Sequence, residues 1–255
     1  MAVPSRAAPT QISIGCAGWS LPRDSWPAFP ESGSHLQRYA QRFNAAEINS
    51  SFYRPHQTST YERWAALTPA GFRFSVKLPK TITHEQRLVN SGKLLGSFMA
   101  QALGLGHRLG CLLVQLPPSL SLDAKIAGLF FKALRARYKG AVALEPRHAS
   151  WFTAEAEVLL QQWCIGRVLA DPVLHDAGRR PGGWPGLVYC RLHGSPRMYY
   201  SSYDSATLQA LADRMQLAAQ NGAGVWCIFD NTASGAATHN ALELTRRVSG
   251  AQAPR

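Results

Sequence analysis

Residues 111–147 read CLLVQLPPSLSLDAKIAGLFFKALRARYKGAVALEPR and contain the repeating unit that decides the fold. The segment begins with an apolar run over residues 111–116 and ends with a second run over residues 141–147. Between them, residues 123–138 carry apolar side chains at helical spacing: Ile126, Leu129, Phe130 and Leu134. This spacing predicts an amphipathic helix. A strand, a helix and a second strand in this order are typical of a βαβ unit, in which the two strands are parallel.

Strand-like runs of this kind recur along the chain at intervals of about 30 residues, the length of one βα unit. They span residues 12–19, 45–53, 72–78, 111–116, 141–147, 165–171, 187–193 and 225–230. Helical patterns also cover residues 204–220 and 236–248. Residues 172–186 include GRRPGGWPG, which cannot form the interior of a helix because of its prolines and glycines.

We therefore predict an α/β protein, a single TIM-type (β/α)₈ barrel with eight parallel strands and an irregular segment after strand six. The length of 255 residues agrees with the roughly 250 of one such barrel. We expect one domain over residues 1–255, with its core at 12–249 and flexible ends at 1–10 and 250–255.

Side chains alternate between two faces along these runs, and the alternation predicts where each face points. Glu47 and Asn49 share one face while Ile48 takes the other, and in the next run Lys77 is opposite to Val76. We expect the apolar face to meet the outer helices. The other face should line the barrel and become polar toward the carboxyl end of each strand, where barrel enzymes have their active sites.

Composition limits the choice of partners and compartment. The chain has 27 Lys and Arg against 15 Asp and Glu, a net charge of +12. This surplus favours anionic partners, either a small anionic molecule or nucleic acid, although no recognised nucleic-acid-binding motif occurs. Five cysteines without a CxxC pair indicate reduced thiols. No signal peptide and no apolar stretch of about 20 residues is found, so we expect a cytoplasmic protein with no membrane contact.

Polar residues gather at the ends of the predicted strands and in the loops that follow. The candidate catalytic residues are Glu47, Lys77, His84, Glu145, His148 and His193. The candidate substrate-binding residues are Asn49, Tyr53, Gln115, Arg147, Trp151, Arg191, Gly194, Tyr203 and Asn231. Ionisable groups are costly to bury unless they are paired or used, so their convergence at one rim indicates a functional site.

Within this set, Glu145 and Glu47 can act as an acid–base pair, with His148 or His193 as the proton shuttle. Lys77, Arg147 and Arg191 can bind an anion through their N–H donors. Two alternatives stay open. The arginines can instead neutralise the two glutamates as a plug of salt bridges in the barrel mouth, and Lys77 can form a Schiff base rather than an ion pair.

A divalent metal is the one cofactor considered. Its candidate ligands are Glu145, His148, His193 and Asp230. The spacing of these residues matches no tight metal-binding motif such as HExxH. GLGHRLG at residues 104–110 precedes a strand instead of following one, and its spacing is not GxGxxG, so no nucleotide cofactor is predicted.

Several long motifs, taken together and in this order, resemble the YecE-like proteins, domain-of-unknown-function family 72. They are IGCAGW at residues 14–19, EINSSFYRPHQTSTYERWAALTPAGFRFSVKLPKTITH at 47–84, VQLPP at 114–118, ALEPRHASWF at 143–152 and RLHG at 191–194. The resemblance covers residues 12–244 and implies a TIM-barrel fold. It implies that the signature positions are Glu47, Asn49, Tyr53, Lys77, His84, Gln115, Glu145, Arg147, His148, Arg191, His193 and Gly194. The chain departs from the family pattern where Asp230 follows Phe229, a position that is usually Asn.

The family brings no established reaction, and three functions remain. The leading hypothesis is an enzyme, of the hydrolase or isomerase/lyase class, that uses acid–base chemistry on a small anionic or polyhydroxylated (phosphorylated or sugar-like) substrate at the barrel mouth. The first alternative is a nucleic-acid-binding protein or metal-dependent phosphoesterase, because of the +12 charge and the aromatic residues of the loops. The resemblance also implies a barrel similar to those of sugar isomerases and of a metal-dependent endonuclease that cuts abasic DNA, but this is an analogy of fold alone. The second alternative is a non-catalytic ligand-sensing barrel. The sequence predicts no particular oligomeric state.

Overall fold

The structure is a computed structural model that describes residues 12–250, so the predicted flexible ends lie outside the described residues apart from Gly250. The strands are β1 (Ile12–Cys16), β2 (Ala45–Ile48), β3 (Arg73–Lys77), β4 (Leu109–Gln115), β5 (Ala141–Glu145), β6 (Ile165–Arg167), β7 (Leu169–Asp171), β8 (Gly182–Gly183), β9 (Leu187–Leu192) and β10 (Gly224–Phe229). The α-helices are α1 (His35–Tyr39), α2 (Thr58–Ala66), α3 (Gly92–Ala102), α4 (Ala124–Arg137), α5 (Ala154–Gln162), α6 (Ser205–Gln220) and α7 (Ala236–Val248).

The strands form two sheets, with orders β1-β10-β9-β7 and β2-β3-β4-β5-β6-β8. Neighbouring strands are parallel except for β8, which pairs antiparallel with β6. The predicted α/β class with parallel strands is therefore confirmed. In residues 12–250 the ladders make two sheets, one of them mixed, and not one closed ring of eight parallel strands.

Hydrogen bonds also connect the two sheets where they approach each other. The predicted strand 165–171 is divided into β6 and β7, and between them the Val168 N–H donates to the Leu144 carbonyl (2.8 Å). At the other seam the Gly18 N–H donates to the Glu47 carbonyl (2.9 Å), beside an isolated parallel bridge from Ala17. These contacts keep the strand ends of both sheets beside one another.

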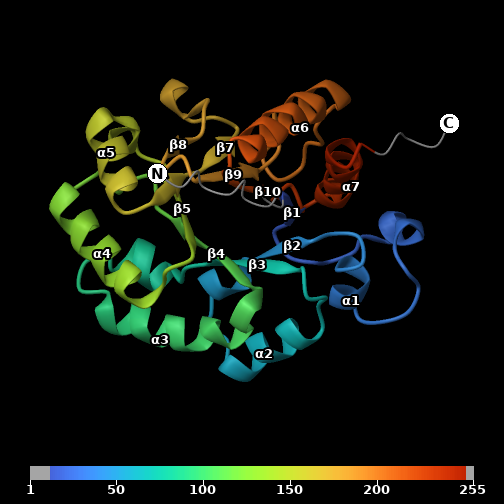
Figure 1. The fold of residues 1–255 in the computed structure, drawn as a ribbon, viewed down its shortest axis with the longest axis horizontal. Helices are drawn as coiled ribbons and strands as arrows, with labels where there is room; N and C mark the ends of the chain where they lie inside the picture. The colour runs from blue at the N-terminus through green and yellow to red at the C-terminus, as the bar shows by residue number, and fades with distance from the viewer. Residues whose placement is uncertain (1–11, 251–255) are drawn as a thin grey trace, which may run out of the picture.

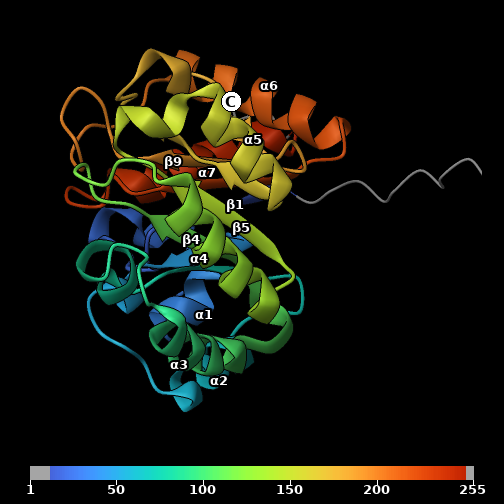
Figure 2. The same cartoon turned by 90° about the vertical axis from the view of Figure 1, so that its left-hand side faces the viewer.

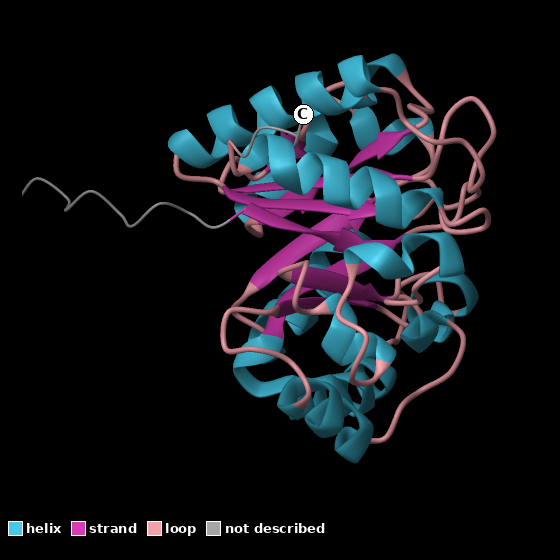
Figure 3. Cartoon of the chain, turned by 90° about the vertical axis from the view of Figure 1, so that its right-hand side faces the viewer, coloured by secondary structure: helices cyan, strands magenta, loops and turns pink. Residues whose placement is uncertain are grey.

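Helices cover the outside of the strands (Figure 1). Figure 2 shows α5, α6 and α7 toward one side of the strands and α1 to α4 toward the other, and Figure 3 shows helices on both sides of the strands from the opposite direction. Residues 172–186 contain no α-helix, as predicted, but only a short turn at Asp176–Gly178 and strand β8. No helix among the described residues has both the length and the apolar composition needed to cross a membrane.

Acidic residues begin two of the helices that the sequence predicted. The Asp123 carboxylate accepts a hydrogen bond from the Ile126 N–H at the start of α4 (2.9 Å), and Asp204 does the same for Thr207 at the start of α6 (2.8 Å). Each carboxylate satisfies one of the unpaired N–H groups at the helix start. These two residues, placed inside the predicted helices, are therefore their N-caps.

The predicted alternation of side chains is confirmed by two separate apolar clusters. Outward positions such as Val76 and Leu144 belong to a large cluster with the helices. Inward positions form a small cluster between the strands, where the Tyr189 and Trp226 rings stack with an angle of 7° between their planes. Ala143 belongs to this inner cluster, two residues before the polar end of β5. The interior is thus apolar in its middle and becomes charged toward the carboxyl ends of the strands.

Candidate functional site

Arg191, at the end of β9, lies at the centre of the charged residues that the strand ends bring together. Its Nη2 is 2.7 Å from Oε1 of Glu47 on β2, and its Nη1 is 3.3 Å from Oε2 of Glu145 on β5. Nη2 also lies 3.0 Å from Oδ2 of Asp230, the residue after β10. All four side chains are buried. The guanidinium therefore neutralises carboxylates from three different strand ends.

A histidine and a second arginine complete this group. Nε2 of His193 is 2.9 Å from Oε1 of Glu145, and its Nδ1 is 3.0 Å from Oδ2 of Asp230. Nη2 of Arg147 lies 2.7 Å from the same Glu145 oxygen, with 14% of the arginine side chain exposed. We call these residues the charged cluster: Glu47, Glu145, Arg147, Arg191, His193 and Asp230.

The charged cluster rests on a polar layer that joins it to the inner apolar core. The Tyr189 hydroxyl lies 3.0 Å from Oε2 of Glu47 and 2.9 Å from the Ser75 hydroxyl. Both Tyr189 and Ser75 are fully buried. Since the three residues come from β9, β2 and β3, these bonds cross the space between the two sheets. They leave the Glu47 carboxylate with partners on both oxygens.

Electrostatics fix the protonation states of the charged cluster. Burial alone would raise the pKa of Glu145, but Arg191, His193 and Arg147 together hold it well below its ordinary value. Burial likewise opposes ionisation of Asp230, whose pKa is lowered by Arg191 and by its bond to His193. Burial would lower the pKa of His193, yet its bonds to Asp230 and Glu145 raise it. At neutral pH the two carboxylates are therefore ionised, and His193 keeps its proton to a higher pH than a free histidine.

Lys77 lies at the end of β3 with 5% of its surface exposed. Its Nζ is 4.1 Å from the centre of the Phe52 ring, and the His84 ring packs edge-on against the same phenylalanine at 4.9 Å. Burial and then the charge of Arg191 lower the pKa of Lys77 to about 8, although the nearby carboxylates act in the opposite direction. The pKa of His84 is also lowered, first by burial and then by Lys77 and Arg147. Lys77 and His84 therefore belong to one polar site with the charged cluster.

Comparison with other proteins now gives the family. A sequence profile described as "Protein of unknown function DUF72" matches residues 13–255. The chain belongs to the DUF72 family. This confirms the resemblance found in the sequence.

Relatives and solved structures agree with this assignment. The chain is 30% identical over 167 residues to UPF0759 protein YecE of Escherichia coli (strain K12), a match that covers 63% of this chain and 59% of YecE. It is 29% identical over 150 residues to UPF0759 protein YunF of Bacillus subtilis (strain 168), covering 56% of this chain and 52% of YunF. The aligned part of the DUF72 chain thus spans between half and three fifths of these relatives.

The fold is similar to that of solved DUF72 family proteins. One from Thermotoga maritima superposes with a TM-score of 0.74 at 24% identity, covering 93% of this chain and 99% of that chain. Another, from Enterococcus faecalis, gives a TM-score of 0.75 at 20% identity, covering 94% and 96%. At this identity the likeness concerns the fold alone.

Other predicted site residues of this DUF72 protein have structural partners. Nδ1 of His148 accepts a hydrogen bond from the Ser150 N–H as a helix N-cap. Trp151 is buried, and its Nε1–H donates to the Leu120 carbonyl (2.9 Å). Within residues 12–250, His148 makes no hydrogen bond to the charged cluster, and Trp151 is buried in the core. The structure therefore does not bring these two predicted site residues together with the charged cluster.

Three further residues hold the loops above the strands. The Tyr203 hydroxyl donates to Oδ1 of Asp171 (2.8 Å) and accepts from the Gly194 N–H (2.8 Å). The buried Asn231 amide donates to the carbonyl of Ser201 (2.9 Å). These bonds make Tyr203, Gly194 and Asn231 supports of the loops, although Oδ1 of Asn231 has no hydrogen-bond partner among the described residues.

The remaining predicted binding residues are more open. Tyr53 is 68% exposed, and Gln115 on β4 is half-buried next to Glu145 in the strand register. Asn49 is also half-buried, and its Oδ1 has no hydrogen-bond partner within the described part of the chain. These side chains remain candidates for contact with a substrate.

Sequence reasoning left four residues out of the site list although the structure places them against it. Ser75 and Tyr189 support Glu47, Phe52 contacts both Lys77 and His84, and Tyr199 packs edge-on against His193 at 5.9 Å. The alternation of side chains along their strands placed Ser75 and Tyr189 on the inner face, so the sequence pattern could have indicated that both lie near the site. Phe52 was placed inside the predicted strand 45–53 but lies in a short 3₁₀ helix (Ser50–Phe52) after β2, and Tyr199 lies in a turn, so period two gives the direction of neither side chain.

The candidate metal ligands do not form a metal site. Within residues 12–250 no group of three or more His, Cys, Asp or Glu side chains is arranged to hold a metal ion. Glu145, His193 and Asp230 lie together, but both ring nitrogens of His193 are hydrogen-bonded directly to the two carboxylates. His148 is engaged in its helix cap instead.

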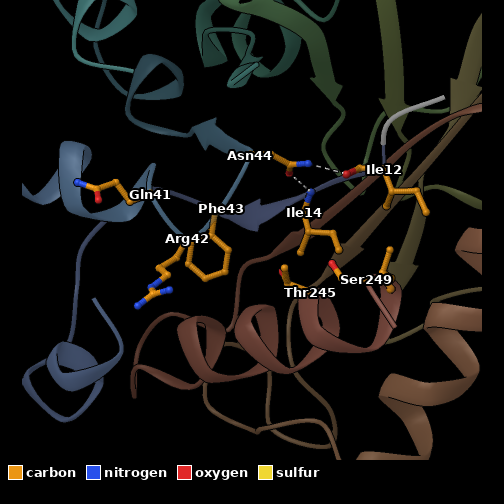
Figure 4. Close-up of a pocket in the computed structure, with 9 residues that line it drawn as sticks. Ile12, Ile14, Gln41, Arg42, Phe43, Asn44, Thr245 and Ser249 are labelled. Carbon is orange, nitrogen blue, oxygen red and sulfur yellow. Dashed lines mark hydrogen bonds between the residues drawn. The ribbon is translucent and has the colours of Figure 1, made fainter. Parts of the chain in front are cut away.

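A separate cavity of about 290 Å³ lies at the opposite ends of the strands, beside the start of β1 (Figure 4). There Asn44 bridges to the β1 backbone, accepting from the Ile14 N–H and donating to the Ile12 carbonyl, both at 2.8 Å. Thr245 and Ser249, from α7 and the residue that ends it, line the other side. This cavity contains none of the residues of the charged cluster.

Proposed function

We propose that this DUF72 protein is an enzyme that acts on a small anionic or polyhydroxylated substrate by acid–base chemistry at the carboxyl ends of its strands. The observation that carries the proposal is the charged cluster, in which carboxylates, arginines and a histidine from four strand ends are buried in one network. Burying such groups costs stability unless pairing is complete, and replacement by apolar residues is often neutral or stabilising. Retaining them is typical of active sites.

The protonation states suggest how the roles are divided. His193, held between Glu145 and Asp230, exchanges the proton with the substrate, and Glu145, kept ionised by its cations, orients the imidazole and stabilises its protonated form. Arg147 and Lys77 supply positive charge for an anionic group of the substrate. Arg191 has a carboxylate at each side of its guanidinium, so in this proposal it orients Glu145 and Asp230 and does not bind the substrate itself.

We also propose that the two sheets work as one barrel of the TIM type. The bonds at both seams and the contacts of Tyr189 with Glu47 and Ser75 across the interior support this. In such a barrel all strand ends open on one mouth, which is where the chemistry of this fold is found.

The test is a ligand screen by thermal unfolding, using inorganic phosphate, sugar phosphates and small hydroxy acids, followed by product analysis of each stabilising compound. We expect Arg147→Ala to weaken binding of the best ligand tenfold or more, and Glu145→Gln to abolish turnover with little change in binding. Arg246→Ala is the matched control, because Arg246 pairs with Glu243 in an exposed i,i+3 pair. If no compound stabilises the protein, or if Arg147→Ala and Arg246→Ala bind alike, the proposal is wrong. Binding without turnover would instead favour the ligand-sensing alternative.

Nucleic-acid binding is the second candidate, and two observations favour it. The net charge is +12, and the Arg197 guanidinium lies 4.0 Å from the centre of the half-exposed Tyr200 ring, a combination that can stack on a base. Binding of a labelled single-stranded oligonucleotide should then fall steeply with added salt. No binding at low salt would dispose of this candidate.

A further inference from the structure

We infer that Lys77 is a nucleophile that condenses with a small aldehyde or ketone bearing an anionic group, forming an imine in the site. The inference rests on the proposed function, because it uses the same group of residues at the strand ends, and it adds the class of substrate.

The geometry leaves the amine of Lys77 without a counter-ion. Among the described residues no carboxylate oxygen lies within 4.0 Å of its Nζ, which instead faces the Phe52 ring. The nearest acidic groups, Glu47, Glu145 and Asp230, are already paired with Arg191. An ion pair would keep the lysine protonated. Burial instead removes water from the ammonium group, and contact with an aromatic ring compensates for this loss only in part, so the neutral amine is favoured.

Each charged group near Lys77 either raises or lowers its pKa. Burial and Arg191 from β9 lower its pKa, and Glu47, Glu145 and Asp230 raise it, with a net value of about 8. At pH 7.5 roughly a quarter of such amines are neutral, against about one in a thousand for a lysine with the ordinary pKa of 10.5. His84, which also packs against Phe52, has a lowered pKa as well and adds little positive charge at this pH.

The reaction needs only the amine and the carbonyl compound. The Nζ lone pair forms a bond to the carbonyl carbon while the C=O π electrons move to oxygen, and a proton passes from nitrogen to that oxygen. The resulting carbinolamine loses its hydroxyl group together with the second amine proton, as water, which leaves a C=N bond. Arg147, partly exposed beside Glu145, offers a cation for the anionic group of the carbonyl compound.

The test is reductive trapping of the full-length protein with glyoxylate and sodium cyanoborohydride at pH 7.5, followed by digestion and mass spectrometry of each lysine. We expect carboxymethylation of Lys77 to be at least tenfold faster than that of Lys80, and its rate to rise with a midpoint near pH 8. Lys80 is the matched control, because it lies three residues away, is half-exposed and is paired with Glu85 at 3.3 Å. Equal or slower labelling of Lys77 overturns the inference.

A second measurement separates this inference from the proposed function. Glycolate has about the size and the charge of glyoxylate but a hydroxyl group in place of the aldehyde, so it can bind the site without forming an imine. Protection of Lys77 from labelling by glycolate, lost in Arg147→Ala, supports both proposals. Glycolate binding that depends on Arg147, without preferential labelling of Lys77, overturns the imine and leaves the acid–base proposal standing. Rapid labelling that neither glycolate nor Arg147→Ala affects supports the nucleophile but contradicts the anion site.

Discussion

Replacing Arg191 by methionine removes the cation at the centre of the charged cluster and is the sharpest perturbation that the structure offers. The Glu47, Glu145 and Asp230 carboxylates would stay buried and lose their shared partner. Loss of one partner from a buried ion pair costs about 3–5 kcal/mol, because the remaining charge is left without compensation. We expect the free energy of unfolding of Arg191→Met at pH 7 to fall by about this amount. Urea unfolding followed by tryptophan fluorescence measures it.

The pH dependence separates this electrostatic cost from a packing defect. In the native protein Glu145 and Asp230 have lowered pKa values, so their stabilising contribution is present above their unfolded pKa values and is lost as the pH falls through the folded ones. In Arg191→Met, the folded pKa values of both carboxyls move upward, because burial is then opposed only by Arg147 and His193 at Glu145 and by His193 at Asp230. The variant then gains stability relative to the native protein as the pH falls from 7 toward 4, and the gap between them narrows.

Arg247→Met is the control, because Arg247 forms a partly exposed i,i+4 pair with Glu243 at 2.7 Å. Its loss should change the free energy of unfolding by about 0–1 kcal/mol, since surface ion pairs contribute little. A cost below about 1 kcal/mol for Arg191→Met, or a gap that stays constant between pH 7 and 4, would refute the reasoning.

Three further predictions concern other parts of the site and its support. Tyr189→Phe removes the hydroxyl that contacts Glu47 and Ser75 inside the fold, and should lower the free energy of unfolding by about 1–3 kcal/mol in urea, because buried polar groups lose their partner. Trp151→Ala removes a buried core side chain and should lower the free energy of unfolding by about 3–5 kcal/mol. Tyr53→Ala, at an exposed position, should change it by no more than about 0.5 kcal/mol. Equal effects of the two substitutions in thermal unfolding would contradict the placement of Trp151 in the core. NMR titration should give His193 a raised pKa that falls in Asp230→Asn, because the bond to Asp230 favours the charged imidazole. Because the folded pKa is raised, protonated His193 stabilises the fold fully below the unfolded pKa, and this contribution is lost as the pH rises through the folded pKa. A His193 titration with no upward shift would exclude the bond to Asp230.

The positions of most strands and the faces of their side chains could be predicted, because the alternation of apolar and polar residues is a local property of the chain. The alternation at Glu47, Ile48 and Asn49 already separated the inner face from the outer one, and the two apolar clusters confirm it. The division of residues 165–171 into two strands could not be predicted in this way, since it depends on the hydrogen bond from the Val168 N–H to the Leu144 carbonyl on a different strand. Strand β8 could not be predicted either, because its two glycines pair with β6 after a long irregular segment.

The candidate site was predictable where strands fix the direction of side chains, and not where loops do. Glu47, Lys77, Glu145 and Arg191 meet because each occupies an inward position near the end of a strand. His148 and Trp151 are also close to a strand end in sequence, but they lie in a helical turn that directs them elsewhere. What the sequence left open was the choice between a plug and a binding role for the arginines, and the geometry places Arg191 among carboxylates.

The charges of the site argue against its being a plug alone. The carboxylates of Glu47, Glu145 and Asp230 face Arg191, Arg147 and His193, whose pKa is raised, so a plug is neutral with these residues alone when the imidazole carries its proton. Lys77 is an additional cation, buried at the same mouth, and neutralisation does not require it. A buried amine in this position is stable either as the neutral base or beside an anion that comes from outside the chain. Both outcomes give Lys77 a role with a ligand, whereas a purely structural plug would be more stable with an apolar residue there.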